Sequence, residues 1–346
     1  MALEQPGLVV KLRPTGPWRI GPDTGDRHFV DVTYHSDSLY AAVTGAMRLL
    51  GHLEDWLDAT ARNPAGSAVR FSSCFPFIDE IGFVMPPRSV WPPADSTKVR
   101  WKSARFIPLG LVGPLLAGNV LEEDRWSVDG VSECLTPAGR SGPFRPALRP
   151  AAAVDRLTGR CEPHSTACLE FSAGAGLWAV IGFADEESGA RWAMPVRAAL
   201  RLLADSGFGG ERSRGWGRAA EPEFVEGTLP GMILPDAPAD AIPSETPQHS
   251  TGSAHWLLSL FTPGPQDAVD WNGGNYSVLT RGGRVDSPAR SGDVKKLLRM
   301  VEEGSVLLAP GALAGAAPDV APDDFPHPVY RAGFALAIPV PWQAAS

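Results

Sequence analysis

Cysteine is scarce in this sequence, and a long apolar run is missing. Only four cysteines occur among 346 residues, at widely spaced positions. This pattern does not predict a disulfide framework and is typical of a reduced, cytoplasmic protein. The most apolar uncharged stretch, residues 106–121, is interrupted by prolines and glycines and is shorter than the roughly 20 residues of a membrane-spanning helix. The start of the chain, MALEQPG, resembles no secretion signal. We therefore expect a cytoplasmic protein without a membrane segment.

The sequence also lacks the spacing patterns of common enzyme sites. No G-x-S-x-G, H-E-x-x-H, paired-carboxylate or kinase pattern occurs. Cys161, His164 and Cys168 could supply three zinc ligands, but their spacing matches no standard zinc finger and no fourth ligand lies nearby in the sequence. We therefore expect no cofactor, no bound metal and no catalytic residue, with a metal at these three residues as the minor alternative.

Charge is unevenly distributed along the chain. The net charge of −8 argues against a protein that coats nucleic acid with its whole surface. Residues 88–105 and 140–160 nevertheless each carry a net charge of +4, whereas residues 221–245 contain acidic side chains without lysine or arginine. The asymmetry predicts local basic faces on an acidic body.

The order of the predicted elements favours an α+β fold. Glycine (37 residues) and proline (34 residues) are too frequent for a helical bundle. Apolar spacing predicts helices over 39–50, 191–204 and 294–301. Extended runs predict strands at 8–13, 69–71, 82–85, 105–109, 223–226, 255–261, 276–280, 305–308 and 334–340. Strands mixed with few helices indicate ferredoxin-like units. A β-hairpin with a protruding charged tip at 155–160 is also predicted.

We predict two domains on this basis. The N-terminal domain spans residues 1–226 and contains the hairpin, at about 140–184, and a glycine-rich loop at 207–218. Residues 227–252, which are rich in Pro, Ser, Thr and Asp, form the predicted linker. The C-terminal domain spans residues 253–346.

The glycine-rich loop is the sharpest local feature. Its glycines allow backbone N–H groups to approach an anion, and Arg212, Arg214 and Arg218 add positive charge. It is neither a phosphate-binding P-loop nor a dinucleotide fingerprint, because it runs from helix into strand and has no lysine. RNA or phosphate contact is favoured over a loop that needs glycine only for its turns. Trp216 could stack on a base or pack in the core.

His35 is the best candidate among the seven histidines for contact with an anion. It precedes the predicted helix 39–50, whose first N–H groups would favour a phosphate. A plain capping or surface histidine is an equally good interpretation, and both are favoured over catalysis.

The order of the motifs resembles the RAMP proteins of CRISPR effectors. A strand is followed by HSDSL (35–39), SCFPF (73–77), AVDRLTG (153–159) and the glycine-rich loop. In the C-terminal half, RGG (281–283), VEEGSV (301–306), HPVYRAG (327–333) and AIPV (337–340) are similar to the fourth Csm subunit of type III-A complexes. The resemblance extends from residue 8 to residue 340.

This resemblance implies two ferredoxin-like (RRM-like) RAMP domains, a thumb hairpin that wedges between bases and a glycine-rich loop on the RNA backbone. It implies a non-catalytic subunit that caps the crRNA 5′ handle in antiviral defence. The implied protein partners are the large polymerase-like signature subunit and a backbone RAMP subunit, with no direct DNA contact. The predicted RNA-binding residues are His35, Ser36, Asp37, Arg149, Asp155, Arg156, Leu157, Arg160, Gly209, Gly210, Arg212, Ser213, Arg214, Trp216 and Arg281.

Two other functions compete with this one. The first is a RAMP-type, metal-independent endoribonuclease that processes the crRNA precursor, with His35 as general acid or base. The second is a two-domain scaffold without a role in RNA binding, in which the arginines pair with the acidic segment.

Overall fold

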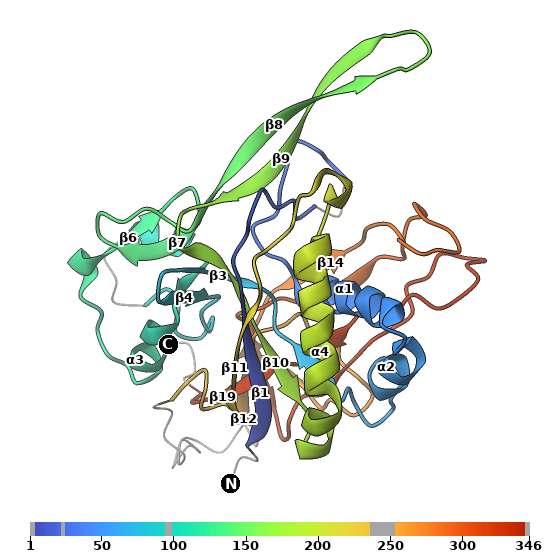
Figure 1. The fold of residues 1–346 in the computed structure, drawn as a ribbon. Coiled ribbons are helices and arrows are strands. Elements are labelled where there is room, and N and C mark those ends of the chain that lie inside the picture. The colour runs from blue at the N-terminus through green and yellow to red at the C-terminus, as the bar shows by residue number, and fades with distance from the viewer. Residues whose placement is uncertain (1–3, 22–24, 94–98, 236–252, 343–346) are drawn as a thin grey trace.

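A seven-stranded antiparallel sheet forms the centre of the protein (Figure 1). The computed structural model describes residues 4–21, 25–93, 99–235 and 253–342. The strand order is β11 (Glu223–Leu229), β1 (Gln5–Leu12), β10 (Ala175–Phe183), β3 (Phe75–Ile78), β4 (Ile81–Val84) and β5 (Ile107–Pro108), with β2 (Val69–Phe71) paired to β10. Every residue of β10 is buried, because both faces of the sheet are covered.

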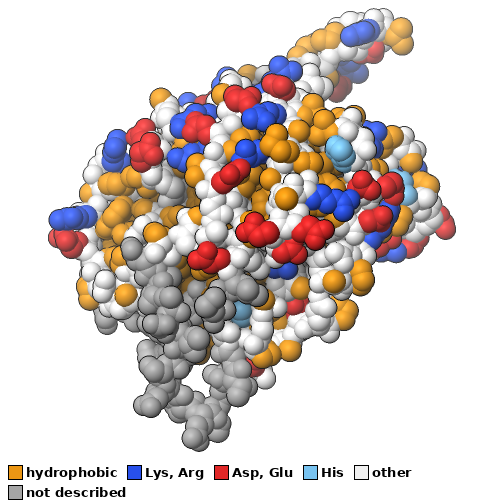
Figure 2. Space-filling model, turned by 60° about the horizontal axis from the view of Figure 1, so that its bottom comes forward, with side chains coloured by type: hydrophobic (Ala, Val, Ile, Leu, Met, Phe, Trp, Pro, Cys, Tyr) orange, Lys and Arg blue, Asp and Glu red, His pale blue; other side chains and the backbone are white. Residues whose placement is uncertain are grey.

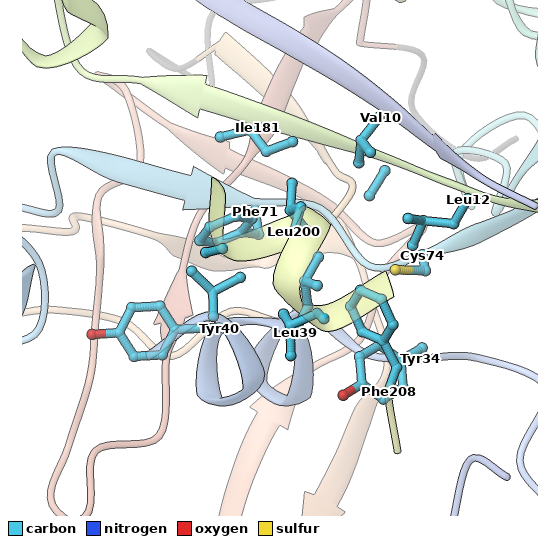
Figure 3. Close-up of a cluster of buried hydrophobic side chains, with 14 of the residues drawn as sticks. Val10, Leu12, Tyr34, Leu39, Tyr40, Phe71, Cys74, Ile181, Leu200 and Phe208 are labelled. Atoms are coloured by element: carbon cyan, nitrogen blue, oxygen red, sulfur yellow. The ribbon is translucent and has the colours of Figure 1, made fainter. Parts of the chain in front are cut away.

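Three helices cover one face of this sheet: α1 (Ser36–Leu49), α2 (Leu53–Ala59) and α4 (Glu186–Ser206). Figure 3 shows how Leu39 of α1 and Leu200 of α4 lie beneath Val10 of β1 and Ile181 of β10. Burying a large apolar side chain contributes about 1.5–3 kcal/mol, so this cluster is a main source of stability. The helices predicted over 39–50 and 191–204 correspond to α1 and α4.

The other face of the large sheet packs against a second sheet from the C-terminal half. This sheet has the order β13 (Asp270–Asn275), β16 (Val306–Ala309), β12 (Ser253–Leu257) and β19 (Ala337–Val340). Trp178 and Trp256 belong to one shared buried cluster. The indole N–H of Trp256 donates to the carbonyl oxygen of Met85 at 3.1 Å. The two predicted domains therefore share a core, and their boundary stays a prediction. Most of the predicted linker, residues 236–252, lies outside the described residues.

The predicted helix over 294–301 is wrong. Within 253–342, no helix occurs, and β15 (Leu298–Val301) instead pairs with β14 (Val278–Arg281). The apolar spacing is helical, but Val294 and Leu297 are 59% and 71% exposed and bury no stripe. Pairing with a strand 20 residues earlier in the chain therefore prevails over the local pattern. The last small pair is β17 (Gly315–Ala316) with β18 (Gly333–Phe334).

A long hairpin and several short elements complete the N-terminal half. The hairpin consists of β8 (Phe144–Val154) and β9 (Cys161–Phe171) and extends far from the body (Figure 1). The short elements are η1 (Val99–Ser103), η2 (Leu109–Leu111), α3 (Val112–Leu116), η3 (Glu123–Arg125), η4 (Arg212–Arg214) and the pair β6 (Trp126–Asp129) and β7 (Cys134–Pro137). The predicted α+β class is confirmed. None of the helices among the described residues has the length and apolarity needed to span a membrane.

Candidate nucleic-acid interface

The hairpin has two different faces. Residues opposite each other on paired antiparallel strands point to the same side, and the side alternates along each strand. One side carries no charged residue and includes Phe144, Leu148 and Val154 with their partners on β9. The other carries Arg145 and Arg149 with their partners Glu170 and Thr166. Phe144 is buried at the base, whereas Leu148 and Val154 are exposed further out.

The tip of the hairpin is organised by Asp155. Its carboxylate accepts hydrogen bonds from the backbone N–H of Leu157 at 2.9 Å and from the hydroxyl of Thr158 at 2.5 Å. The Thr158 hydroxyl and the Leu157 N–H lower the pKa of Asp155, because both bonds favour the charged form. This turn presents Leu157, which is 97% exposed, together with Arg156 and Arg160. The predicted protruding tip at 155–160 is therefore present.

The charges of the hairpin are more balanced than residues 140–160 alone suggest. Its four arginines are opposed by three carboxylates, so β8, β9 and the tip carry a net charge of +1. Arg145 and Arg149 both contact Glu170, at 2.9 and 2.5 Å. Arg156 and Arg160 have no carboxylate partner among the described residues. Figure 2 shows basic side chains, with acidic ones beside them, at the outer end of the hairpin, and a mixture of acidic and basic side chains on the body. Within the hairpin, the positive charge that has no carboxylate partner is therefore concentrated at the tip.

The glycine-rich loop lies at the base of the hairpin and is held by aromatic packing. The ring of Trp18 stacks on Phe208 of the loop at 5.1 Å and meets Phe171 of β9 edge-on at 6.2 Å. Trp18 also forms a β-bridge with Leu169 of β9. On the loop itself, Arg214 lies 3.4 Å from Nε2 of His164 on the hairpin. One buried indole thus fixes the loop and the hairpin relative to each other.

Steric demands explain several of the loop glycines. Gly209 and Gly217 have positive φ angles of 70° and 78°. A Cβ atom at Gly209 would lie 2.3 Å from the carbonyl oxygen of Arg19, and one at Gly217 would lie 2.0 Å from that of Phe208. Gly210 donates its N–H to the Arg19 carbonyl. These glycines are needed for the path of the backbone, which agrees with the turn interpretation. Phosphate binding by the loop stays a prediction.

The arginines of the loop already have carboxylate partners. Arg212 contacts Asp286 at 2.9 Å and Arg214 contacts Glu211 at 3.1 Å. Arg218 has no such partner among the described residues. Ser213 is exposed beside these arginines, and Trp216 is half-buried, so its indole is accessible without being free of the core.

The motif at the start of α1 is buried and contacts the C-terminal half. Asp37 binds Arg281 at 3.0 Å and also pairs with Arg331. The hydroxyl of Ser36 accepts a hydrogen bond from the backbone N–H of Leu260 at 3.0 Å. The side chain of Arg281 is likewise buried. The structure therefore uses Ser36, Asp37 and Arg281 to join the two halves, and their predicted RNA contact stays a prediction.

His35 lies between two carboxylates in the same junction. Its ring is 4% exposed, with Nδ1 at 2.8 Å from Glu303 and Nε2 at 3.6 Å from Asp31. Burial lowers the pKa of His35, but Glu303 and Asp31 outweigh burial and raise it to about 9. Burial raises the pKa of Asp31, but the hydrogen bond and charge of His35, together with smaller contributions from Thr33 and Arg105, outweigh burial and lower the pKa to about 2. The imidazole is therefore positively charged at neutral pH.

Sequence reasoning missed the roles of Glu303 and Arg331. Both lie inside motifs of the C-terminal half, VEEGSV and HPVYRAG, that carry the resemblance to the Csm subunit. In the structure, these motifs converge on α1 through His35 and Asp37. An acidic or basic residue in a half-polar motif indicates no specific partner, so the sequence offered no signal for this contact.

Strand geometry keeps the three possible zinc ligands apart. Cys161, His164 and Cys168 all belong to β9. Cys161 pairs with Val154 on the uncharged side of the hairpin, whereas His164 pairs with Ala151 on the other side. No group of three potential metal ligands occurs in the part of the chain that the structure describes.

Comparison with known proteins finds a family match in the C-terminal part of the chain. Residues 250–340 match the family model of the CRISPR Csm4 C-terminal domain. The chain carries a Csm4-type C-terminal domain. This confirms the resemblance to the fourth Csm subunit that the sequence motifs predict. No curated protein sequence matches the chain.

Solved structures show the same fold over nearly the whole length. A crystal structure of a Csm3–Csm4 subcomplex in the type III-A CRISPR-Cas interference complex aligns with 97% of this chain and 99% of the matched chain, with a TM-score of 0.63 and 16% identity. A Csm1–Csm4 cassette in complex with cA4 aligns with 99% of both chains, with a TM-score of 0.56 and 17% identity. The chain therefore shares its overall fold with chains of these two complexes.

Proposed function

We propose that this chain is the RNA-binding subunit of a type III-A (Csm) CRISPR interference complex and caps the 5′ handle of the crRNA. It connects the large signature subunit to the backbone subunits. The proposal on protein partners is supported by the relatives of this fold, which were solved together with Csm1 and with Csm3. The observation that carries the RNA part is the hairpin tip, where Arg156, Leu157 and Arg160 are exposed and the two arginines lack carboxylate partners.

The chemistry of the tip suits single-stranded RNA. Such RNA is held by contacts to its phosphates and by side chains that stack on or insert between unpaired bases. Arg156 and Arg160 supply the charge, and Leu157 supplies an apolar wedge. The glycine-rich loop adds Arg218 and the half-buried indole of Trp216 at the hairpin base. RNA that contacts both regions would lie along the charged side of the hairpin.

The geometry around His35 counts against the endoribonuclease alternative. A general acid or base must reach the ribose hydroxyl or the leaving oxygen directly or through one water molecule. The imidazole of His35 is enclosed by Glu303 and Asp31 and is almost completely buried. Its function in this structure is to join α1 to the β15–β16 turn.

The test compares two pairs of arginines on the full-length chain. Single-stranded RNA with a repeat-derived 5′ end is titrated at several salt concentrations. We expect the double variant Arg156→Ala and Arg160→Ala to bind about tenfold more weakly, with a salt slope smaller by about two. The control is Arg48→Ala with Arg299→Ala, two exposed arginines that have no carboxylate partner among the described residues. Equal losses in both double variants would contradict the site.

Assembly requires a separate experiment. The tagged chain is purified from a reconstituted operon, and its bound RNA is sequenced and crosslinked to peptides. We expect RNAs that share one repeat-derived 5′ end, crosslinked within 155–160 or 209–218, together with the large and backbone subunits. RNA with random ends, or no RNA, would overturn the capping function.

A further inference from the structure

An arginine of the glycine-rich loop forms an ion pair with a carboxylate from the C-terminal half. Arg212 donates from Nη2 to Oδ2 of Asp286 at 2.9 Å, across 74 residues of sequence. The side chain of Arg212 is 50% exposed and that of Asp286 is 78% exposed. The contact therefore lies at the surface, where a dissolved anion has access to the same guanidinium.

Asp286 is held in place by an ordered arm between β14 and β15. Val285 donates its N–H to the carbonyl of Asp293, and Gly292 donates to the carbonyl of Val285, at 2.8 and 2.9 Å. Lys295 donates to the carbonyl of Gly283 at 2.9 Å. Val285, next to Asp286, is buried. The backbone on both sides of Asp286 is thus anchored, and this places its carboxylate beside the loop.

Carboxylate and phosphate oxygens compete for the same guanidinium geometry. Arginine binds both through its planar array of N–H donors. An exposed ion pair contributes only about 0–1 kcal/mol, so a phosphate that has additional contacts elsewhere can displace the carboxylate. The carboxylate also repels a phosphate that approaches the loop without displacing it.

We propose that Asp286 is a built-in competitor of the RNA phosphate at Arg212. This inference rests on the proposed RNA-binding function of the glycine-rich loop. In the free chain, Asp286 neutralises Arg212 and lowers affinity for RNA that touches the loop alone. RNA that also engages the hairpin tip has enough additional contacts to release Arg212. The carboxylate therefore favours RNA that spans the whole site over RNA that binds anywhere on the surface.

The test uses two aspartates of the same arm. Asp286→Asn removes the competitor, and Asp293→Asn makes the same charge change at a residue that pairs with Arg290 at 2.5 Å instead. The full-length chain is titrated with fluorescently labelled, repeat-derived single-stranded RNA. We expect Asp286→Asn to raise affinity about three- to fivefold and Asp293→Asn to raise it less than about twofold. In an Arg212→Ala background, the two substitutions should have equal effects.

The outcomes separate this inference from the proposed function. Equal effects of Asp286→Asn and Asp293→Asn on RNA affinity in the otherwise native chain would overturn the proposal that Asp286 competes with RNA. A gain from Asp286→Asn that persists in the Arg212→Ala background would overturn it too, because Arg212 would not mediate it. Failure of the native chain to bind the RNA in a salt-sensitive way would instead overturn the proposed function, and the competitor with it.

Discussion

Nδ1 of His35 donates to the carboxylate of Glu303 at 2.8 Å, deep inside the protein. The contact joins the residue before α1 to the turn between β15 and β16, 268 residues later in the chain. The hydroxyl of Ser73 also bonds to Glu303, so three distant segments meet at one carboxylate. A structural function for the motif at the start of α1 follows directly from this arrangement.

Stability should fall at alkaline pH because of this pair. The pKa of His35 is raised from 6.5 to about 9, so the protonated ring stabilises the folded state fully below pH 6.5, and this contribution is lost as the pH rises through about 9. Urea unfolding at pH values from 6 to 10 measures the loss, which we expect to be on the order of 3 kcal/mol. His35→Gln should show a much smaller slope over this range. An equal slope in both proteins would contradict the assignment to His35.

Removal of the charge of Asp37 should strongly destabilise the protein. Asp37→Asn removes the charge of the buried carboxylate that pairs with both Arg281 and Arg331, and breaking such a buried pair costs about 3–5 kcal/mol. The control is Asp55→Asn, because Asp55 is exposed and 3.9 Å from Arg191. We expect a loss below about 0.5 kcal/mol there. Urea unfolding followed by tryptophan fluorescence compares the two, and a similar small loss in both would argue against the junction.

Two glycines of the loop should differ in their tolerance of alanine. Gly215 and Gly217 have the same φ of 78°, but only at Gly217 does a new Cβ meet backbone, 2.0 Å from the Phe208 carbonyl oxygen. We expect Gly215→Ala to cost about 1–2 kcal/mol, because of its φ alone. Gly217→Ala should cost clearly more, since the loop must also move. Thermal unfolding distinguishes the two, and equal shifts would mean that the close approach is relieved without cost.

Leu157 should matter for RNA and not for stability. Its side chain is almost completely exposed, so Leu157→Ala should change the free energy of unfolding by less than about 0.5 kcal/mol. If the tip inserts between bases, the same substitution should weaken RNA binding several-fold and reduce crosslinks at the tip. Val225→Ala, at an exposed position of the edge strand β11, is the matched control. RNA affinity that is unchanged in both variants would remove Leu157 from the site.

Local patterns predicted the elements that local interactions form. The hairpin tip could be predicted from the sequence because a charged turn at 155–160 separates two extended runs. The helices α1 and α4 could be predicted because each has an apolar stripe that the fold buries. The error at 294–301 arose where a helical spacing has no surface to bury and a distant strand supplies the pairing. Asp37 shows a second limit. Its position at a helix start is compatible with an anion site, and only the fold reveals the two arginines, more than 240 residues away, that take its charge.

The regular pairing of β8 with β9 limits how the length of the hairpin can change. Pairing runs from Phe144 with Phe171 to Val154 with Cys161 without a bulge. Deleting one residue from each strand would turn the outer segment over and exchange its uncharged and charged sides. Deleting two from each would shorten the reach by about 7 Å and preserve both sides. The hairpin is therefore a spacer whose length is adjustable only in steps of two residues per strand, independently of the body that carries it.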